Sequence, residues 1–294
     1  MITAGIDVGT QSIKVVVLSN SQILAARTDH NCSGRAFGLE GLSPKACSAP
    51  SNSSHIIATK TLVTEEGGAV GSKTAMEQIL ADTGLSRSDL TYIVATGVGR
   101  STVSFAQKTR TEQLSHARGA FYLFPTARTV LDIGAEGTRA MKLDEKGGVK
   151  NFVCNSKCAA GTGAFLEIMA NLLQVSLDEV GELACRAQHI ERVSSYCTVF
   201  AESEVISHIH KGKSRETILA GIIEAVAERS FELLQKIGIE QDIILSGGTA
   251  KNIGLRKALE RMAGGQLLCP PDPQITGALG AALIAQDNLL SGRR

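Results

Sequence analysis

Two short segments of the chain each place an acidic residue at the end of an apolar stretch and a glycine two positions later. The first is Asp7-x-Gly9 and the second is Asp132-x-Gly134. Backbone N–H groups in such a turn converge on an anion, and two carboxylates can organise a hydrated Mg²⁺. The pattern therefore indicates phosphate and magnesium chemistry, although glycines at these positions also serve ordinary hairpin turns.

Two cysteines, Cys158 and Cys197, each precede a predicted amphipathic helix. Free N–H groups at a helix start favour a thiolate, which is the form that binds metals. A 4Fe–4S cluster needs four protein thiolates, so two per chain would require a two-fold dimer. The spacing alone is no metal signature, and buried structural cysteines remain the alternative. Cys154 is an alternative ligand on a predicted strand.

The elements that position these residues follow an α/β pattern. Residues 4–18 and 129–141 both predict a strand, a glycine turn and a returning strand, which indicates an internal duplication. We expect an N-terminal lobe over residues 1–125 and a C-terminal lobe over residues 126–294. Residues 29–53 have the composition of a surface insertion, and the segments on either side, 21–28 and 54–61, each resemble the third strand of one meander.

Further helices and strands complete the prediction. Apolar spacing predicts a helix over residues 74–85 and two amphipathic helices with stripes at 165–173 and 218–233. A strand over residues 242–245 leads into a glycine pair, and small residues predict a closing helix over 276–283.

Composition excludes several classes of function. The 294 residues carry a net charge of +1 and no basic run, which argues against nucleic-acid binding. No apolar run approaches the ~20 residues that span a bilayer, and the start lacks a leader-like pattern. Seven scattered cysteines suit a reducing compartment. We therefore expect a cytoplasmic protein without a membrane partner.

The order of these motifs resembles the superfamily of actin, sugar kinases and heat-shock chaperones. The resemblance implies a duplicated, ribonuclease-H-like ATPase fold with a nucleotide cleft between two lobes. It extends to a first phosphate segment, a second phosphate segment, an adenosine segment and two connecting segments. In that order the matching residues are Asp7, Gly9, Thr10, Gln11 and Lys14; Asp132 and Gly134; Gly247, Gly248 and Asn252; and Gly161, Thr162 and Gly163 with Gly277–Gly280.

The segments KCAAGTGAFLEIMA and SSYCTVFAESEVIS resemble the cluster motifs of one family within that fold. It comprises the 2-hydroxyacyl-CoA dehydratase activators and the ATPase subunits of benzoyl-CoA reductase. The resemblance implies ATP, Mg²⁺ and one 4Fe–4S cluster per dimer, held by Cys158 and Cys197 of each subunit. It also implies a reduced ferredoxin or flavodoxin as electron source and acyl-CoA reductase or dehydratase subunits as partners. ATP binding would move the cluster helices and drive low-potential electron transfer.

One departure bears on which branch the chain resembles. Activators usually read Asp-Ile-Gly-Gly-Gln-Asp after the second phosphate strand, whereas Glu136 and Gly137 replace the last two residues here. Glu136 is then the candidate for the water-orienting position, and fast independent hydrolysis is in doubt. This variation, with His116-Ala117-Arg118-Gly119-Ala120 upstream, favours an ATPase-type subunit of benzoyl-CoA reductase, as homodimer or heterodimer.

Three alternatives stay open. The first is an activator of a 2-hydroxyacyl-CoA dehydratase. The second is a small-molecule kinase on the same fold, which would need an acidic base facing a polar pocket. The third is a non-hydrolysing, ATP-sensing partner that only completes the cluster of a sister chain.

Overall fold

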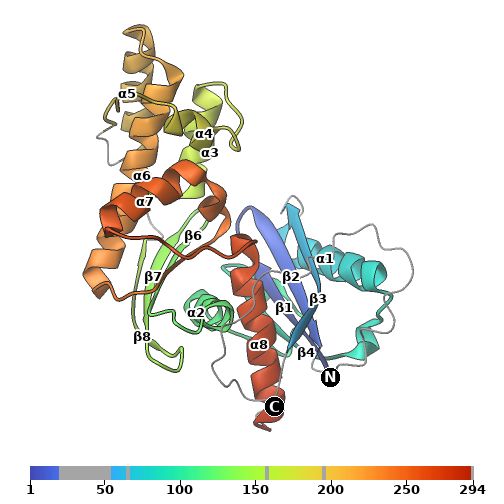
Figure 1. Cartoon of the computed structure of the whole chain (residues 1–294). Helices are drawn as coiled ribbons and strands as arrows, with labels where there is room; N and C mark the ends of the chain where they lie inside the picture. The colour runs from blue at the N-terminus through green and yellow to red at the C-terminus, as the bar shows by residue number, and fades with distance from the viewer. Residues whose placement is uncertain (20–53, 64–66, 156–158, 194–196, 293–294) are drawn as a thin grey trace. The chain divides into compact units, whose positions relative to one another are not determined.

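The computed structural model describes residues 1–19, 54–63, 67–155, 159–193 and 197–292. The chain forms two compact units, each with its own sheet (Figure 1). Unit 1 contains Met1–Ser115 and Gly277–Arg294, and unit 2 contains His116–Thr276. Unit 2 thus begins ten residues before the expected lobe boundary at residues 125 and 126, and the closing helix is grouped with unit 1.

The sheet of unit 1 has five strands in the order β3-β2-β1-β4-β5. β1 pairs antiparallel with β2 and parallel with β4. The strands are β1 (Ile2–Val8), β2 (Ser12–Ser19), β3 (His55–Val63), β4 (Leu90–Thr96) and β5 (Lys108–Thr109). The helical elements are α1 (Gly67–Thr83), η2 (Arg87–Asp89), η3 (Arg100–Thr102) and α8 (Thr276–Leu290).

The two faces of β1 contact different helices. Ala4, Ile6 and Val8 share a core with the buried side chains of α1. On the other face, the Thr3 hydroxyl donates a hydrogen bond to the Ala282 carbonyl of α8 at 3.2 Å. Alternate residues of a strand point to opposite faces, so a single strand joins both layers. α8 is therefore part of the core of unit 1.

The sheet of unit 2 repeats this arrangement with four strands in the order β8-β7-β6-β9. β6 pairs antiparallel with β7 and parallel with β9. The strands are β6 (Thr129–Ile133), β7 (Thr138–Leu143), β8 (Val149–Asn155) and β9 (Ile243–Ser246). The same strand order and directions in both units confirm the predicted duplication.

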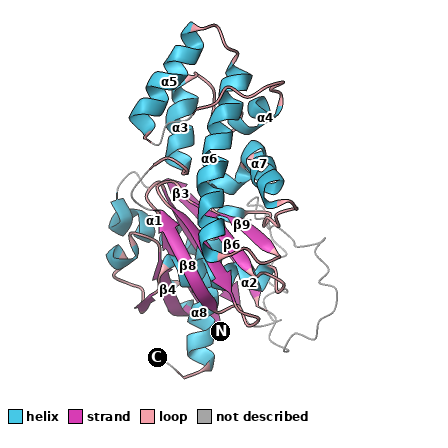
Figure 2. Ribbon diagram, turned by 90° about the vertical axis from the view of Figure 1, so that its left-hand side faces the viewer, coloured by secondary structure: helices cyan, strands magenta, loops and turns pink. Residues whose placement is uncertain are grey.

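Helices make up most of the rest of unit 2, where α3, α4 and α5 gather beside α6 (Figure 2). The helices are α2 (Glu112–Leu123), α3 (Gly163–Leu172), α4 (Val180–Cys185), α5 (Thr198–His210), α6 (Arg215–Ile237) and α7 (Ile253–Ala263). Two short 3-10 helices, η4 (Gly248–Lys251) and η5 (Pro273–Ile275), precede and follow α7. The predicted apolar stripes of α3 and α6 are confirmed, because Phe165, Met169, Ile218 and Ile222 lie in one buried core.

Some boundaries differ from the sequence prediction. α1 begins at Gly67 rather than at Thr74, and its extra turns include Gly71, which faces Ile13 of β2. Of the two candidates for the third strand, residues 54–61 correspond to β3. The other candidate and the predicted insertion at 29–53 lie outside the described residues. In the described part of the chain, no helix combines the length and apolarity that a membrane crossing requires.

Candidate functional site

Asp132 stands one residue before the end of β6, and both of its carboxylate oxygens are engaged. Its Oδ2 accepts a hydrogen bond from Arg139 Nη1 at 3.1 Å. Its Oδ1 lies 3.3 Å from His116 Nδ1 and accepts a bond from Ser246 Oγ at 3.4 Å. All four residues are buried. A buried carboxylate is stable only with such partners, so Asp132 is fixed in one position.

Asp7 holds the equivalent position on β1 but has a looser environment. It faces Lys14 across the strand pair, as Asp132 faces Arg139. Lys14 Nζ lies 3.9 Å from Asp7 Oδ2, beyond hydrogen-bond distance, and donates instead to the Ser12 carbonyl at 3.2 Å. The carboxylate of Asp7 is therefore the better placed of the two to interact with a hydrated cation.

The two predicted phosphate turns have the same backbone closure. Gly9 N donates to the Ser12 carbonyl at 3.0 Å, and Gly134 N donates to the Gly137 carbonyl at 2.8 Å. A positively charged side chain lies beside each turn, Lys14 in unit 1 and Arg139 in unit 2. A Cβ added at Gly9 would be 3.2 Å from Lys14 Nζ, and one added at Gly137 would be 3.2 Å from Arg139 Nη2. Such turns combine converging N–H groups with a nearby positive charge, which suits a phosphate. At the tips, the predicted residues Thr10, Gln11 and Glu136 are exposed.

A second glycine in each unit approaches the acid from the neighbouring parallel strand. Gly97 follows β4 with φ +91°, and Gly247 follows β9 with φ +90°. A Cβ at Gly97 would lie 2.5 Å from Asp7 Oδ1, and one at Gly247 would lie 2.7 Å from Asp132 Oδ1. Both the backbone angle and the close approach require glycine. Gly247 was predicted, whereas Gly97 was not assigned to the site.

The predicted connecting segment at residues 161–163 lies against the second phosphate turn. Gly163, the first residue of α3, donates its N–H to the Gly134 carbonyl at 2.9 Å. A Cβ at Gly163 would also lie 2.8 Å from Thr249 Oγ1, which follows the glycine pair of the adenosine segment. The predicted second phosphate, connecting and adenosine segments therefore contact one another within unit 2.

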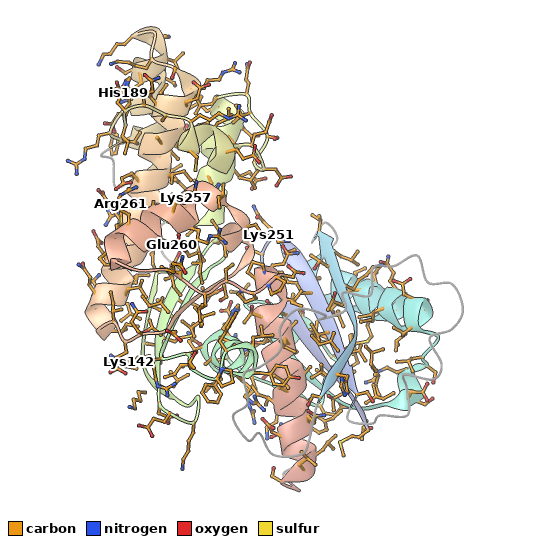
Figure 3. The ribbon with its side chains drawn as sticks, in the orientation of Figure 1. Lys142, His189, Lys251, Lys257, Glu260 and Arg261 are labelled. Atoms are coloured by element: carbon orange, nitrogen blue, oxygen red, sulfur yellow. The ribbon has the colours of Figure 1, made fainter. Side chains whose placement is uncertain are left out.

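The predicted adenosine residues sit at the start of two helical elements. Gly247 is the N-cap and Gly248 the first residue of η4. Asn252 is the N-cap of α7, where its Oδ1 accepts a hydrogen bond from Leu255 N at 3.0 Å. Lys251, labelled in Figure 3, ends η4. Its Nζ lies 3.4 Å from Asp272 Oδ1. Asn252 therefore has a structural task that the sequence did not reveal. Gly277, by contrast, lies in α8 and belongs to unit 1.

Cys197 is the N-cap of α5 and is exposed. This confirms the predicted thiol at a helix start, and an exposed thiol suits a ligand set completed from elsewhere. Cys158 lies outside the described residues. The helix that follows it, α3, begins at Gly163.

The other described cysteines differ in their surroundings. Cys154 and Cys185 are exposed, on β8 and at the end of α4. Burial raises the pKa of the Cys269 thiol, which keeps it protonated. Among the residues with described positions, no three His, Cys, Asp or Glu side chains form a potential metal site.

Four residues of the site were not assigned to it from the sequence: His116, Arg139, Ser246 and Gly97. Their positions depend on which strands pair and in which register. One signal was present, because Thr96-Gly97 and Ser246-Gly247 are both a hydroxyl residue and a glycine at the end of a strand. Comparing these two dipeptides would have extended the repeat to β4 and β9.

Residues 4–285 match the family model described as the BadF/BadG/BcrA/BcrD ATPase family. The activator of lactoyl-CoA dehydratase from Anaerotignum propionicum is 40% identical over 287 residues, which cover 98% of each chain. A benzoyl-CoA reductase subunit from Thauera aromatica is 35% identical over 292 residues, covering 96% of this chain and 92% of that protein.

A solved structure agrees over the whole length. The activator of the 2-hydroxyisocaproyl-CoA dehydratase from Clostridium difficile, with bound ADPNP, has a TM-score of 0.83 and 36% identity. The match covers 100% of this chain and 97% of that chain. It confirms the expected fold class, the actin-like ATPase fold with two lobes.

Proposed function

The chain belongs to the BadF/BadG/BcrA/BcrD ATPase family, and on that premise we propose that it is the ATP-hydrolysing activator of a 2-hydroxyacyl-CoA dehydratase. In this role it passes electrons at low potential to the dehydratase. The observation that carries the proposal is an arrangement found in both units, in which a strand-end carboxylate faces a basic side chain across a glycine turn. It is combined with an exposed cysteine at the start of α5.

The nucleotide part of the proposal assigns different tasks to the two acids. Asp7 orients the water shell of Mg²⁺, because its carboxylate has no cation within hydrogen-bond distance among the described side chains. Asp132 instead fixes Arg139 beside the turn of Gly134, where the guanidinium stabilises phosphate charge. Glu136, exposed at the tip of that turn, is the candidate for orienting the attacking water.

The cluster part of the proposal rests on Cys197 and Cys158. A 4Fe–4S cluster needs four thiolates. Two copies of the chain would supply them, each through Cys197 and Cys158. Such a cluster, when bound, supplies the one-electron carrier, with a reduced ferredoxin or flavodoxin as its source. The backbone of α5 fixes the place of Cys197, because this residue occupies the N-cap position of that helix.

The activator reading replaces the reductase reading that the turn of Glu136 and Gly137 favoured. The relative at 40% identity and the solved structure at 36% are both dehydratase activators, whereas the relative from the reductase is 35% identical. The turn of Glu136 and Gly137 is by itself a weak guide to the choice between the two branches. Gly137 stands where activators usually have a second acid, and the Arg139 side chain lies beside it. An ATPase subunit of benzoyl-CoA reductase remains the second candidate.

The test is anoxic purification of the full chain, followed by assays of iron, sulfide and ATP hydrolysis. We expect a brown protein with one cluster per two chains. Adding it with ATP and a reductant to lactoyl-CoA dehydratase should start dehydration. Asp7→Asn should abolish this activation while leaving iron content unchanged.

Matched cysteine variants separate the cluster claim from the nucleotide claim. Cys197→Ser should lose iron and sulfide, whereas Cys185→Ser, which changes another exposed cysteine of unit 2, should retain both. Full cluster content in Cys197→Ser would refute the ligand assignment. Activation of a reductase but of no dehydratase would favour the second candidate, and ATP binding without turnover would favour the ATP-sensing role.

A further inference from the structure

The turn between β6 and β7 is hydrogen-bonded to the start of α3. We propose that Thr138 is a positioning residue that fastens this connection and so transmits nucleotide occupancy at the turn to α3. The inference rests on the proposed function in one respect, the assignment of the turn at Gly134–Gly137 to a phosphate.

Three hydrogen bonds make the connection. Gly163 N donates to the Gly134 carbonyl at 2.9 Å, and Ala164 N donates to the Ala135 carbonyl at 2.8 Å. The Thr138 hydroxyl donates to the Gly161 carbonyl at 2.7 Å, and this bond is buried. Free N–H groups at a helix start need acceptors, and here the turn supplies them. A phosphate that displaces the turn must therefore displace the beginning of α3 or break these bonds.

Comparison of the two units shows that the hydroxyl is a feature of unit 2. Thr138 pairs with Ile133 across β6 and β7, and the equivalent pair in unit 1 is Ile13 with Val8. Ile13 packs into the apolar core against α1. The duplicated position therefore carries an apolar side chain in one unit and a helix-bonding hydroxyl in the unit that contains α3.

The connection continues to the helix that follows Cys197. Phe165 and Met169 of α3 share one buried core with Ala201 and Val205 of α5. α3 and α5 also lie side by side along α6 (Figure 2). Close-packed helices transmit displacement because they leave no space to absorb it. A shift at the turn thus reaches α5 and its N-cap residue through described contacts alone.

Hydrogen exchange on the full chain tests the inference, with Mg²⁺ and the ATP analogue ADPNP as the probe. In the wild type we expect the analogue to slow exchange of the α3 amides. In Thr138→Val this slowing should fall about five-fold, as expected for the loss of one buried hydrogen bond, while the affinity for the analogue stays unchanged. Thr138→Ser, which keeps the hydroxyl, should behave as the wild type.

Thr129→Val is the matched control, because the Thr129 hydroxyl makes the same kind of bond, to the Glu240 carbonyl at 2.7 Å, at the other end of β6. It should leave the α3 response intact. Thr138→Ala serves in case the valine variant does not fold. Wild-type slowing in Thr138→Val, or in Thr138→Ala where the valine variant does not fold, would overturn the coupling and leave the ATPase assignment standing. No analogue binding by the wild type would overturn the proposed function, and the coupling with it.

Discussion

Arg139 and Asp132 form an ion pair inside unit 2, with Nη1 3.1 Å from Oδ2 and side chains that are 10% and 3% exposed. Removing Arg139 from this buried pair takes away the partner of Asp132 Oδ2 and leaves only the contacts of Oδ1 with His116 and Ser246. That typically costs about 3–5 kcal/mol. Arg139→Met should therefore lower the free energy of unfolding of unit 2 by about 3 kcal/mol, measured by urea denaturation.

The double variant Arg139→Met/Asp132→Asn should lose much less than the sum of the two single losses, because no charge is left unpaired. Lys73→Met is the control. It breaks the exposed pair of Lys73 with Glu77 and should change stability by less than about 0.5 kcal/mol. Additive losses in the double variant would mean that the two side chains act independently.

Asn252 has two separable tasks, the cap of α7 and the proposed contact with adenosine. Asn252→Ala should lower the free energy of unfolding by about 1 kcal/mol, since loss of an N-cap side chain has this typical effect. Asn252→Asp keeps the capping oxygen and loses the amide donor. It should therefore retain stability while weakening ATP binding, as measured by calorimetry. Ser214→Ala, which removes the cap of α6, should lower stability without changing ATP affinity.

Glu191 makes stability dependent on pH at the acidic end. Its carboxylate accepts a bond from Lys213 at 2.6 Å and lies 3.6 Å from His189 (Figure 3) and 3.7 Å from His208. The Lys213 hydrogen bond holds the pKa of Glu191 below its ordinary value of 4.5. The stabilisation is therefore fully present above that value and is lost as pH falls through the lower pKa of the folded state.

Thermal unfolding of the wild type and Glu191→Gln at about pH 6 and about pH 3.5 measures this contribution. At the higher pH the wild type should be more stable than Glu191→Gln. At the lower pH this difference in stability between the two proteins should shrink. Glu182→Gln removes another surface carboxylate, 3.8 Å from Arg186, and serves as the control. A difference between wild type and Glu191→Gln that is the same at both pH values would contradict the assignment.

Gly5 marks the closest approach of β1 to α8. A Cβ at this position would collide with the Ala278 carbonyl and the Ala282 amide, both of which are backbone atoms that cannot rotate away. Gly5→Ala should therefore destabilise unit 1 by at least about 1–3 kcal/mol, the usual range for overpacking. Gly265→Ala adds the same methyl group where the nearest atom is a side-chain nitrogen at 3.7 Å, and it should be close to neutral.

The sequence predicted the elements of the site better than their connections. The apolar stretches ending at Asp7 and Asp132 were sufficient to place both acids, because strand period and glycine turns are local signals. The helix after Cys197 was predicted from local spacing in the same way. The α6 stripe around Ile218 was also visible as a repeat of apolar residues.

The partners of each acid could not be predicted in this way. Arg139 meets Asp132 only because β7 pairs with β6 in one register, and His116 reaches it from α2, sixteen residues earlier. Gly97 approaches Asp7 from a strand that pairs with β1 across more than eighty residues. These contacts depend on strand pairing and its register, which the motifs of a single sequence do not fix.

The position of α8 also sets an order of events during synthesis on the ribosome. The Ala282 carbonyl that receives the Thr3 hydrogen bond is made 279 residues after Thr3. Unit 1 therefore lacks one layer of its core until α8 has been made, and by then every residue of unit 2 has already been added. Since domains fold as units, the nascent chain should complete unit 2 first, and the earliest residues should be among the last to be protected from proteolysis.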